Sequence, residues 1–144
     1  MAGNSLCEPG FVHKPESNLH ALPVPARTLD TTHRLVTFQW LGHSSFLIIT
    51  PAGTVALTDP HSQRVPPTRP DSVTISNENP TRNQAWSVPG DARVLRGRMP
   101  TGERIEVNVT AGGLAMKGLP SSGGSTPDMP VQSTSFVFRT QGLC

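Results

Sequence analysis

Three residues near the middle of the chain have side chains that could hold a metal ion: His43, Asp59 and His61. Two imidazoles and one carboxylate form a sufficient donor set for a transition metal. Each residue also has a simpler role, because His43 could cap a turn after Gly42 and Asp59 precedes Pro60, as turn-forming aspartates do. The three residues are therefore a candidate cleft, with turn formation as the alternative.

A serine-hydrolase arrangement of Ser44, His43 and Asp59 is not expected. Adjacent residues of a strand point to opposite faces, and the sequence contains no nucleophile elbow.

A second group of polar residues, Asn77, Asn79, Thr81 and Arg82, follows a short hydrophobic run. Zinc prefers imidazole, thiolate or carboxylate ligands, so amides, a hydroxyl and a guanidinium are a poor set for a dication. Arg82 with the two asparagines could instead bind an anion. The simpler alternative pairs Arg82 with a nearby acid, Glu78 or Asp91, and Glu78 itself is expected to be an exposed loop residue.

Strands are the elements that must position these residues. Short runs rich in β-branched and aromatic residues alternate with Gly, Pro and Asn, which is typical of a β-rich domain. The run 45–50 is hydrophobic enough to be buried on both faces, and the short Gly-containing link to 54–58 predicts an antiparallel hairpin. Residues 84–86 allow one helical turn at most, and 121–130 is expected to be a loop. The predicted strands are 35–41, 45–50, 54–58, 71–76, 93–96, 104–110, 114–117 and 134–139.

Composition excludes several classes of protein. The net charge is +2 with scattered basic residues, so a nucleic-acid-binding surface is not expected. The longest apolar run is far too short for a membrane span. The first 15 residues contain no apolar segment typical of a signal peptide, so a soluble, cytoplasmic protein is the default expectation. Cys7 and Cys144 form no CxxC motif.

Two regions are expected. Residues 1–33 contain four prolines and no persistent periodicity, which predicts an extended arm. Residues 34–144 are expected to form the β domain.

The β region resembles the metallo-β-lactamase superfamily, in particular its lactonase-like metal-dependent hydrolases. In that family a strand, a Gly-His-Ser turn and a second strand lead to Thr-Asp-Pro, and then to a strand ending in Ser-His-x-His-x-Asp-His. The matching segments of this chain are residues 40–48, 54–60, 70–83 and 88–97. The resemblance implies a mainly β fold, half of an αβ/βα sandwich with an antiparallel or mixed sheet.

The metal motif departs from the family pattern. The positions that would carry the ligands are occupied by Asn77, Asn79, Thr81 and Arg82, and the segment 120–124 has no histidine where the family has its next ligand. The later ligands of the family would follow Cys144. The resemblance therefore implies a degenerate, truncated domain without a catalytic residue or a cofactor.

These observations lead to one functional hypothesis and one alternative. The chain is expected to be a non-catalytic structural or accessory subunit, because half of the sandwich leaves apolar surface and open strand edges. Its partners would be other protein subunits or a second copy, bound through the exposed sheet. The alternative is a metal-dependent hydrolase, with zinc or another divalent metal, whose ligands are completed by a partner chain.

Overall fold

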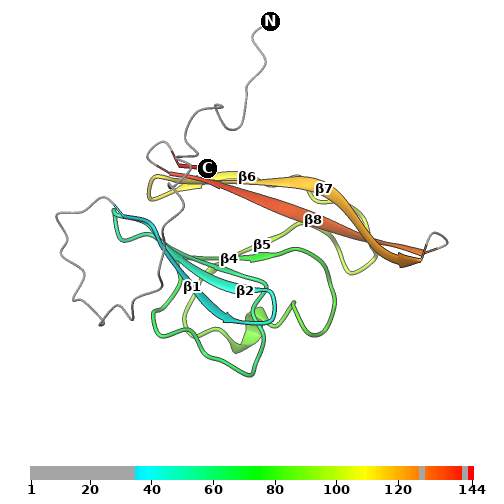
Figure 1. Cartoon of the computed structure of the whole chain (residues 1–144), viewed down its shortest axis with the longest axis horizontal. Coiled ribbons are helices and arrows are strands. Elements are labelled where there is room, and N and C mark those ends of the chain that lie inside the picture. Colours follow the sequence, from blue (N-terminus) through cyan, green and yellow to red (C-terminus); the bar gives the residue numbers. More distant parts are fainter. Residues whose placement is uncertain (1–34, 127–128, 141–142) are drawn as a thin grey trace, which may run out of the picture.

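A computed structural model describes residues 35–126, 129–140 and 143–144. The predicted arm, residues 1–33, lies outside the described residues. The described part of the chain consists of eight strands in two sheets and one short 3-10 helix. It contains no helix long and apolar enough to cross a membrane. The two sheets lie in separate layers (Figure 1). The predicted mainly β class with antiparallel and mixed sheets is confirmed.

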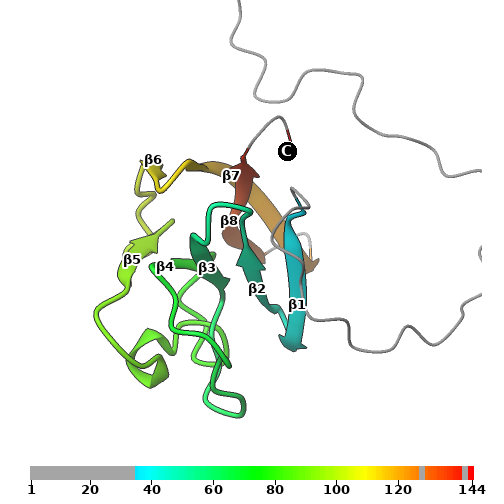
Figure 2. The same cartoon turned by 90° about the vertical axis from the view of Figure 1, so that its left-hand side faces the viewer.

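The larger sheet has five strands in sequence order, with β1 and β5 at its edges (Figure 2). The first three strands are antiparallel, whereas β3, β4 and β5 are parallel. The predicted hairpin between 45–50 and 54–58 is thus confirmed. The predicted helical turn is the 3-10 helix Ala85–Ser87, which lies in the loop before β5. The strands are β1 (Thr37–Gly42), β2 (Ser45–Ile49), β3 (Val55–Thr58), β4 (Ser72–Ile75) and β5 (Arg93–Arg96).

The smaller sheet is antiparallel and consists of β6 (Asn108–Ala111), β7 (Leu114–Thr126) and β8 (Met129–Arg139). Two predictions were wrong here. The strand expected at 104–110 begins only at Asn108, because Ile105 donates its N–H to Gly97 O instead of joining the ladder with β7. The loop expected at 121–130 continues the strands, since cross-strand backbone pairing overrides the Gly/Ser/Pro composition.

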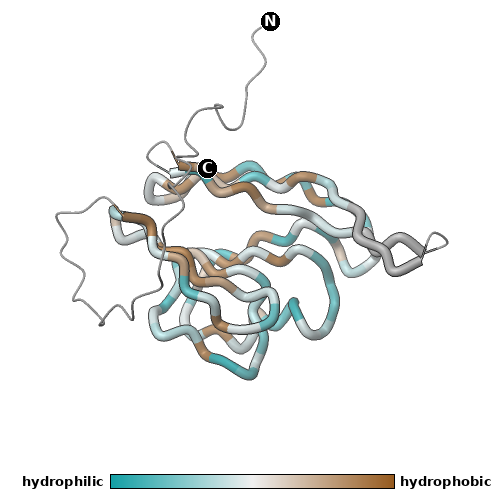
Figure 3. Tube along the Cα trace, in the orientation of Figure 1, coloured by the Kyte–Doolittle hydropathy of each residue, from teal (hydrophilic) through white to brown (hydrophobic). Residues whose placement is uncertain are grey.

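Both faces of the five-stranded sheet contribute to a core. Leu47 and Ile48 are adjacent on β2, yet they belong to different clusters of buried residues. Hydrophobic residues follow β1 and β2 along the chain trace (Figure 3). One cluster lies between the sheets and contains Ile48, Ala56, Leu95, Val107, Leu114 and Met116. The other lies under the loops on the opposite face and contains Leu41, Leu47, Val55, Leu57, Val73, Ile75 and Val88.

The second sheet reduces the apolar surface that half of a sandwich was expected to leave exposed. It covers the face that contains Ile48, and hydrogen bonds join the two sheets at two places. Thr54 Oγ1 donates to Gly112 O at 2.6 Å, and Thr134 donates from its backbone N–H to Ser76 O at 2.9 Å. Large hydrophobic residues remain exposed near β1, among them Phe38, Trp40 and Phe46, and others are exposed elsewhere, such as Trp86 and Val94.

Candidate functional site

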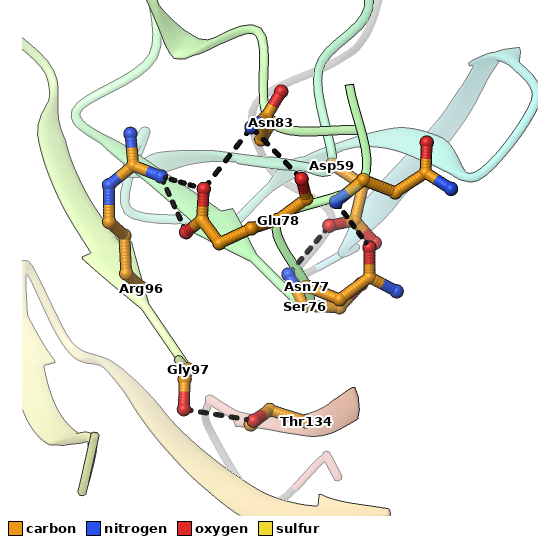
Figure 4. A network of polar contacts seen from close by, with 9 residues as sticks. Asp59, Ser76, Asn77, Glu78, Asn83, Arg96, Gly97 and Thr134 are labelled. Atoms are coloured by element: carbon orange, nitrogen blue, oxygen red, sulfur yellow. Dashed lines mark hydrogen bonds and ion pairs between the residues drawn. The ribbon is translucent and has the colours of Figure 1, made fainter. Parts of the chain in front are cut away.

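The candidate residues meet at the carboxyl end of two parallel strands. Because β3 and β4 run in the same direction, Asp59 after β3 and residues 76–84 after β4 emerge at the same edge. We call residues 76–84 the motif loop. Asp59 donates its backbone N–H to Thr74 O, and its Oδ1 accepts the N–H of Ser76 at 2.7 Å (Figure 4). The Asp59 carboxylate thus anchors the start of the motif loop.

Within the motif loop, the two asparagines use their amide oxygens on neighbouring donors. Asn77 is buried, and its Oδ1 accepts the backbone N–H of Asn79 at 3.0 Å. Asn79 Oδ1 in turn accepts the N–H of Thr81 at 2.9 Å and its hydroxyl at 2.8 Å. These local bonds are the type that asparagine commonly makes in turns. The side chains at three of the four motif positions therefore stabilise the loop itself.

Arg82 does not form either of the ion pairs expected from the sequence. Glu78 binds Arg96 instead, through both carboxylate oxygens at 2.7 and 2.8 Å, and Asp91 pairs with Arg69. Within the described part of the chain, Arg82 Nε is buried and has no hydrogen-bond partner. Its positive charge acts on Asp59, where it favours the ionised carboxylate. The pairing prediction was wrong because β5 brings Arg96 alongside the motif loop.

Glu78 is also not the exposed loop acid that the sequence suggested. Its side chain is only 18% exposed, and it accepts hydrogen bonds from Arg96 and from Asn83 Nδ2 (Figure 4). Asn83 Nδ2 additionally donates to the backbone carbonyl of Glu78. Glu78 therefore ties the motif loop to β5, a role with no signal in the local sequence pattern.

His43 and His61 lie beside one pocket of about 190 Å³. Their ring centroids are 6.4 Å apart and the rings are nearly perpendicular. His43 has a φ of 51°, and its Nε2 lies 3.4 Å from Thr81 Oγ1. The structure thus brings together three sequence-predicted positions from separate segments. The lining residues are His43, His61, Ser62, Gln63, Thr81 and Gln84.

His61 has an unusual environment for an imidazole. It is only 8% exposed, and its Nε2 has no hydrogen-bond partner among the described residues. The ring packs against Gly42, where an added Cβ would lie 3.4 Å from His61 Nε2. Gly42 has a φ of 107°, a conformation that glycine adopts without strain. This glycine therefore allows the His43 turn and the His61 ring to lie close together.

Gln84 is a positioning residue that the sequence pattern did not reveal. Its side-chain oxygen accepts the N–H of Ser62, and its Nε2 donates to Pro80 O at 2.7 Å. Gln84 also donates its backbone N–H to Pro60 O. It thereby holds the segment containing His61 against the motif loop.

Asp59 contributes a carboxylate near this pocket without lining it. Burial raises the pKa of Asp59 above its ordinary value of 3.8, while the Ser76 hydrogen bonds and the charges of Arg82 and His43 oppose that rise. The candidate cleft of His43, Asp59 and His61 is therefore divided. Two imidazoles reach the pocket, and the carboxylate is engaged with the motif loop.

The residues at the four motif positions do not fit a bound dication. The amide oxygens of Asn77 and Asn79 already accept N–H donors, and the Arg82 guanidinium lies close enough to act on Asp59. Zinc requires imidazole, thiolate or carboxylate donors that are free to coordinate it. Across the described ranges, no group of three or more His, Cys, Asp or Glu residues could hold a metal ion.

The described fold and pocket lie in a region that matches a known protein family. Residues 37–144 match the family model described as the beta-lactamase superfamily domain. No curated protein matches the chain. The matched region begins at β1 and includes both sheets, the pocket and the motif loop. The strand pattern and the Gly-His-Ser turn thus occur in the context that the resemblance predicted, and the chain belongs to the beta-lactamase superfamily.

Proposed function

We propose that the protein is a non-catalytic structural or accessory subunit of a larger assembly. One observation carries the proposal: the four positions of the metal motif hold Asn77, Asn79, Thr81 and Arg82, and the first three of these residues stabilise their own loop. The strands around that loop keep a buried core. The fold therefore persists where the donors for metal-dependent hydrolysis have been replaced.

The charge of the motif loop supports the absence of a metal-activated water. A guanidinium is always protonated, and a unit charge about 4 Å from a dication opposes binding strongly in a partly buried site. The nearest carboxylate, Asp59, already accepts the Ser76 N–H. A hydrolase of this kind relies on a metal to lower the pKa of bound water. The residues of the motif loop supply no group that could activate a water molecule in this way.

The surface supports a role in protein binding. Phe38, Trp40 and Phe46 are large hydrophobic residues that are exposed on neighbouring strands. Groups of exposed aromatic residues are typical of protein–protein interaction sites. The protein partner would cover this region of the sheet.

One observation favours a competing function. His43 and His61 face a common pocket, and two imidazoles could join ligands from a partner chain to form a metal-dependent hydrolase. That site would still lack a carboxylate, since Asp59 does not line the pocket. The accessory role is therefore the better supported proposal.

Metal analysis tests the proposal. The purified protein, dialysed against buffer without chelator, is expected to hold far less than one zinc, iron or manganese ion per chain. The matched control is the combined variant Asn77→His, Asn79→His, Thr81→Asp and Arg82→His, which restores three imidazoles and one carboxylate. This variant is expected to retain more zinc than the natural sequence, with an unchanged circular dichroism spectrum. A stoichiometric metal in the natural protein contradicts the accessory role.

A further inference from the structure

An exposed group of aromatic side chains lies on the outer two strands of the five-stranded sheet. We call Phe38, Trp40 and Phe46 the aromatic stripe; they are 66%, 64% and 41% exposed. Trp40 pairs with Phe46 across the β1–β2 ladder, and Phe38 pairs with Ile48. Residues opposite one another in a ladder share a face of the sheet. The aromatic stripe therefore continues the face that holds Ile48, which is buried between the two sheets.

The edge next to this stripe has little protection against strand pairing, since its one irregularity is the bulge between Trp40 and Gly42 at the end of β1. Within the described residues β1 pairs only with β2, and Thr37–Gly42 contains neither a charged residue nor a proline. Native proteins usually protect exposed edges with charges, prolines or very short strands. The other three edges are protected in this way: β5 contains Arg93 and Arg96, β6 is only four residues long, and β8 contains Pro130 and Arg139.

We propose that β1 pairs with β1 of a second copy, in antiparallel orientation about a two-fold axis at Gln39. This inference rests on the proposed structural role and identifies its first partner. Pairing of identical edges is an isologous contact, in which both copies use the same surface, as two-fold homodimers do. It suits β1 because no like charges are brought together, whereas two β5 edges would oppose their arginines. The pairing joins two five-stranded sheets into one continuous sheet.

The register follows from the positions of the aromatic residues. With Gln39 opposite its own copy, Phe38 lies opposite Trp40 of the second copy, and Trp40 lies opposite the second Phe38. A register one residue away would turn the aromatic stripe of the second copy to the other face. The chosen register also uses nearly the whole length of β1 and keeps the bulge between Trp40 and Gly42 at the end of the pairing.

The resulting surface is continuous across the two copies. On each side of the two-fold axis, a row of side chains crosses the joined sheet. It consists of Ile48 and Phe38 of one copy, followed by Trp40 and Phe46 of the second copy. Aromatic pairs opposite one another in antiparallel sheets stabilise strand association. Residues 9–25 of the same chain are a poorer occupant of the edge, because their four prolines cannot donate the ladder hydrogen bonds.

Disulfide cross-linking tests the register directly. Under oxidising conditions Gln39→Cys is expected to form a covalent dimer, because residues directly opposite in a ladder lie within the Cα separation that a disulfide needs. The matched control is Thr37→Cys, whose partner in this register is Leu41 of the second copy rather than another cysteine. Both variants keep Cys7 and Cys144, so any dimer formed by these residues is common to both. Equal cross-linking of the two variants overturns the register.

Light scattering after size exclusion tests the association in the natural chain. The expected mass at high concentration is twice the 15.4 kDa of one chain. Phe38→Ser is expected to weaken the dimer by about tenfold or more, as truncation of a central aromatic commonly does. Its fold should be unchanged, because Phe38 is exposed. A protein that stays monomeric at all concentrations overturns the proposed dimer, whatever covers the β1 edge.

The two proposals fail in distinguishable ways. A tightly bound stoichiometric metal contradicts the accessory role and leaves the dimer intact. A metal-free monomer contradicts the dimer and leaves an accessory role with a different protein partner.

Discussion

The strands of the five-stranded sheet and the motif loop that follows β4 are held together by different forces. The strands bury leucine, isoleucine and valine side chains on both faces of the sheet, in two separate clusters. The motif loop is held by hydrogen bonds among Asn77, Asn79 and Thr81 and by the ion pair between Glu78 and Arg96. Side-chain burial therefore stabilises the sheet, while polar contacts determine the shape of the loop.

This difference bears on the proposed loss of the metal site, because the motif positions lie outside both buried clusters. Burial energy depends on apolar area removed from water, and the motif positions contribute little of it. Asparagine and threonine at those positions make local turn hydrogen bonds. Under the proposal, the sheet therefore stays stable without metal donors in the loop. The following predictions test the comparison between sheet and loop, from the largest expected effect to the smallest.

The largest effect is expected in the sheet. Leu57→Ala should lower the free energy of unfolding by about 2–5 kcal/mol, because Leu57 is fully buried and its truncation leaves a cavity. Urea unfolding followed by circular dichroism measures the change. The control is Gln63→Ala, an exposed pocket residue, which is expected to change the same quantity by less than about 0.5 kcal/mol. Equal effects would remove the distinction between sheet and pocket.

The junction between the sheets should be nearly as sensitive. A Cβ added at Gly97 would lie 2.3 Å from Thr134 Cβ, and Thr134 Oγ1 donates to Gly97 O at 3.1 Å. Gly97→Ala must therefore push β5 and β8 apart, and it is expected to cost about 1–3 kcal/mol of unfolding free energy. Ser135→Ala, at an exposed position next to Thr134, is the control in the same urea experiment. If Gly97→Ala leaves the free energy of unfolding unchanged, the two sheets are not packed closely at this point.

Asp59 joins the sheet to the loop, and its removal should have an intermediate effect. Asp59→Ala leaves the Ser76 N–H without its acceptor and is expected to cost about 1–3 kcal/mol of unfolding free energy. Asp59→Asn keeps an oxygen at the same position and is expected to restore most of this loss. If both variants are equally destabilised, the carboxylate charge rather than the hydrogen bond holds the loop.

The smallest effect concerns pH. Burial raises the pKa of Asp59 above 3.8, so the folded state binds this proton more tightly than the unfolded state. The contribution of Asp59 to stability is then present at low pH and is lost as pH rises through the folded pKa. The stability of the natural protein relative to Asp59→Asn is therefore expected to fall from about pH 4 upward. Urea unfolding of both proteins at a series of pH values measures this difference in unfolding free energy. A difference that increases with pH contradicts the expected direction.

Local pattern predicted much of the fold. Five strands up to residue 96 were found near their expected positions. The prediction that 45–50 is buried on both faces holds for Leu47 and Ile48, which lie in opposite clusters, but was wrong for Phe46, which is 41% exposed. The extended β7–β8 hairpin was missed, because its Gly, Ser and Pro residues are typical of loops. Long-range pairing supplied the hydrogen bonds that composition did not indicate.

The candidate site was only partly predictable. The pocket joins His43 to Thr81, which are 38 residues apart, and both were chosen from their motifs. The ion pair of Glu78 with Arg96 and the bridging role of Gln84 were not expected. Each depends on which segments the parallel strands bring together, and nothing in the spacing of these residues indicates it.

The amino-acid sequence alone determined the strand pattern and the absence of imidazole and carboxylate side chains at residues 77, 79, 81 and 82, because both are properties of individual residues and short segments. Only the tertiary structure decided which face each strand buries, that the second sheet stops short of covering the aromatic stripe, and that Glu78 pairs with Arg96 rather than with Arg82. These contacts join residues far apart in the chain, so their geometry depends on how the sheets pack.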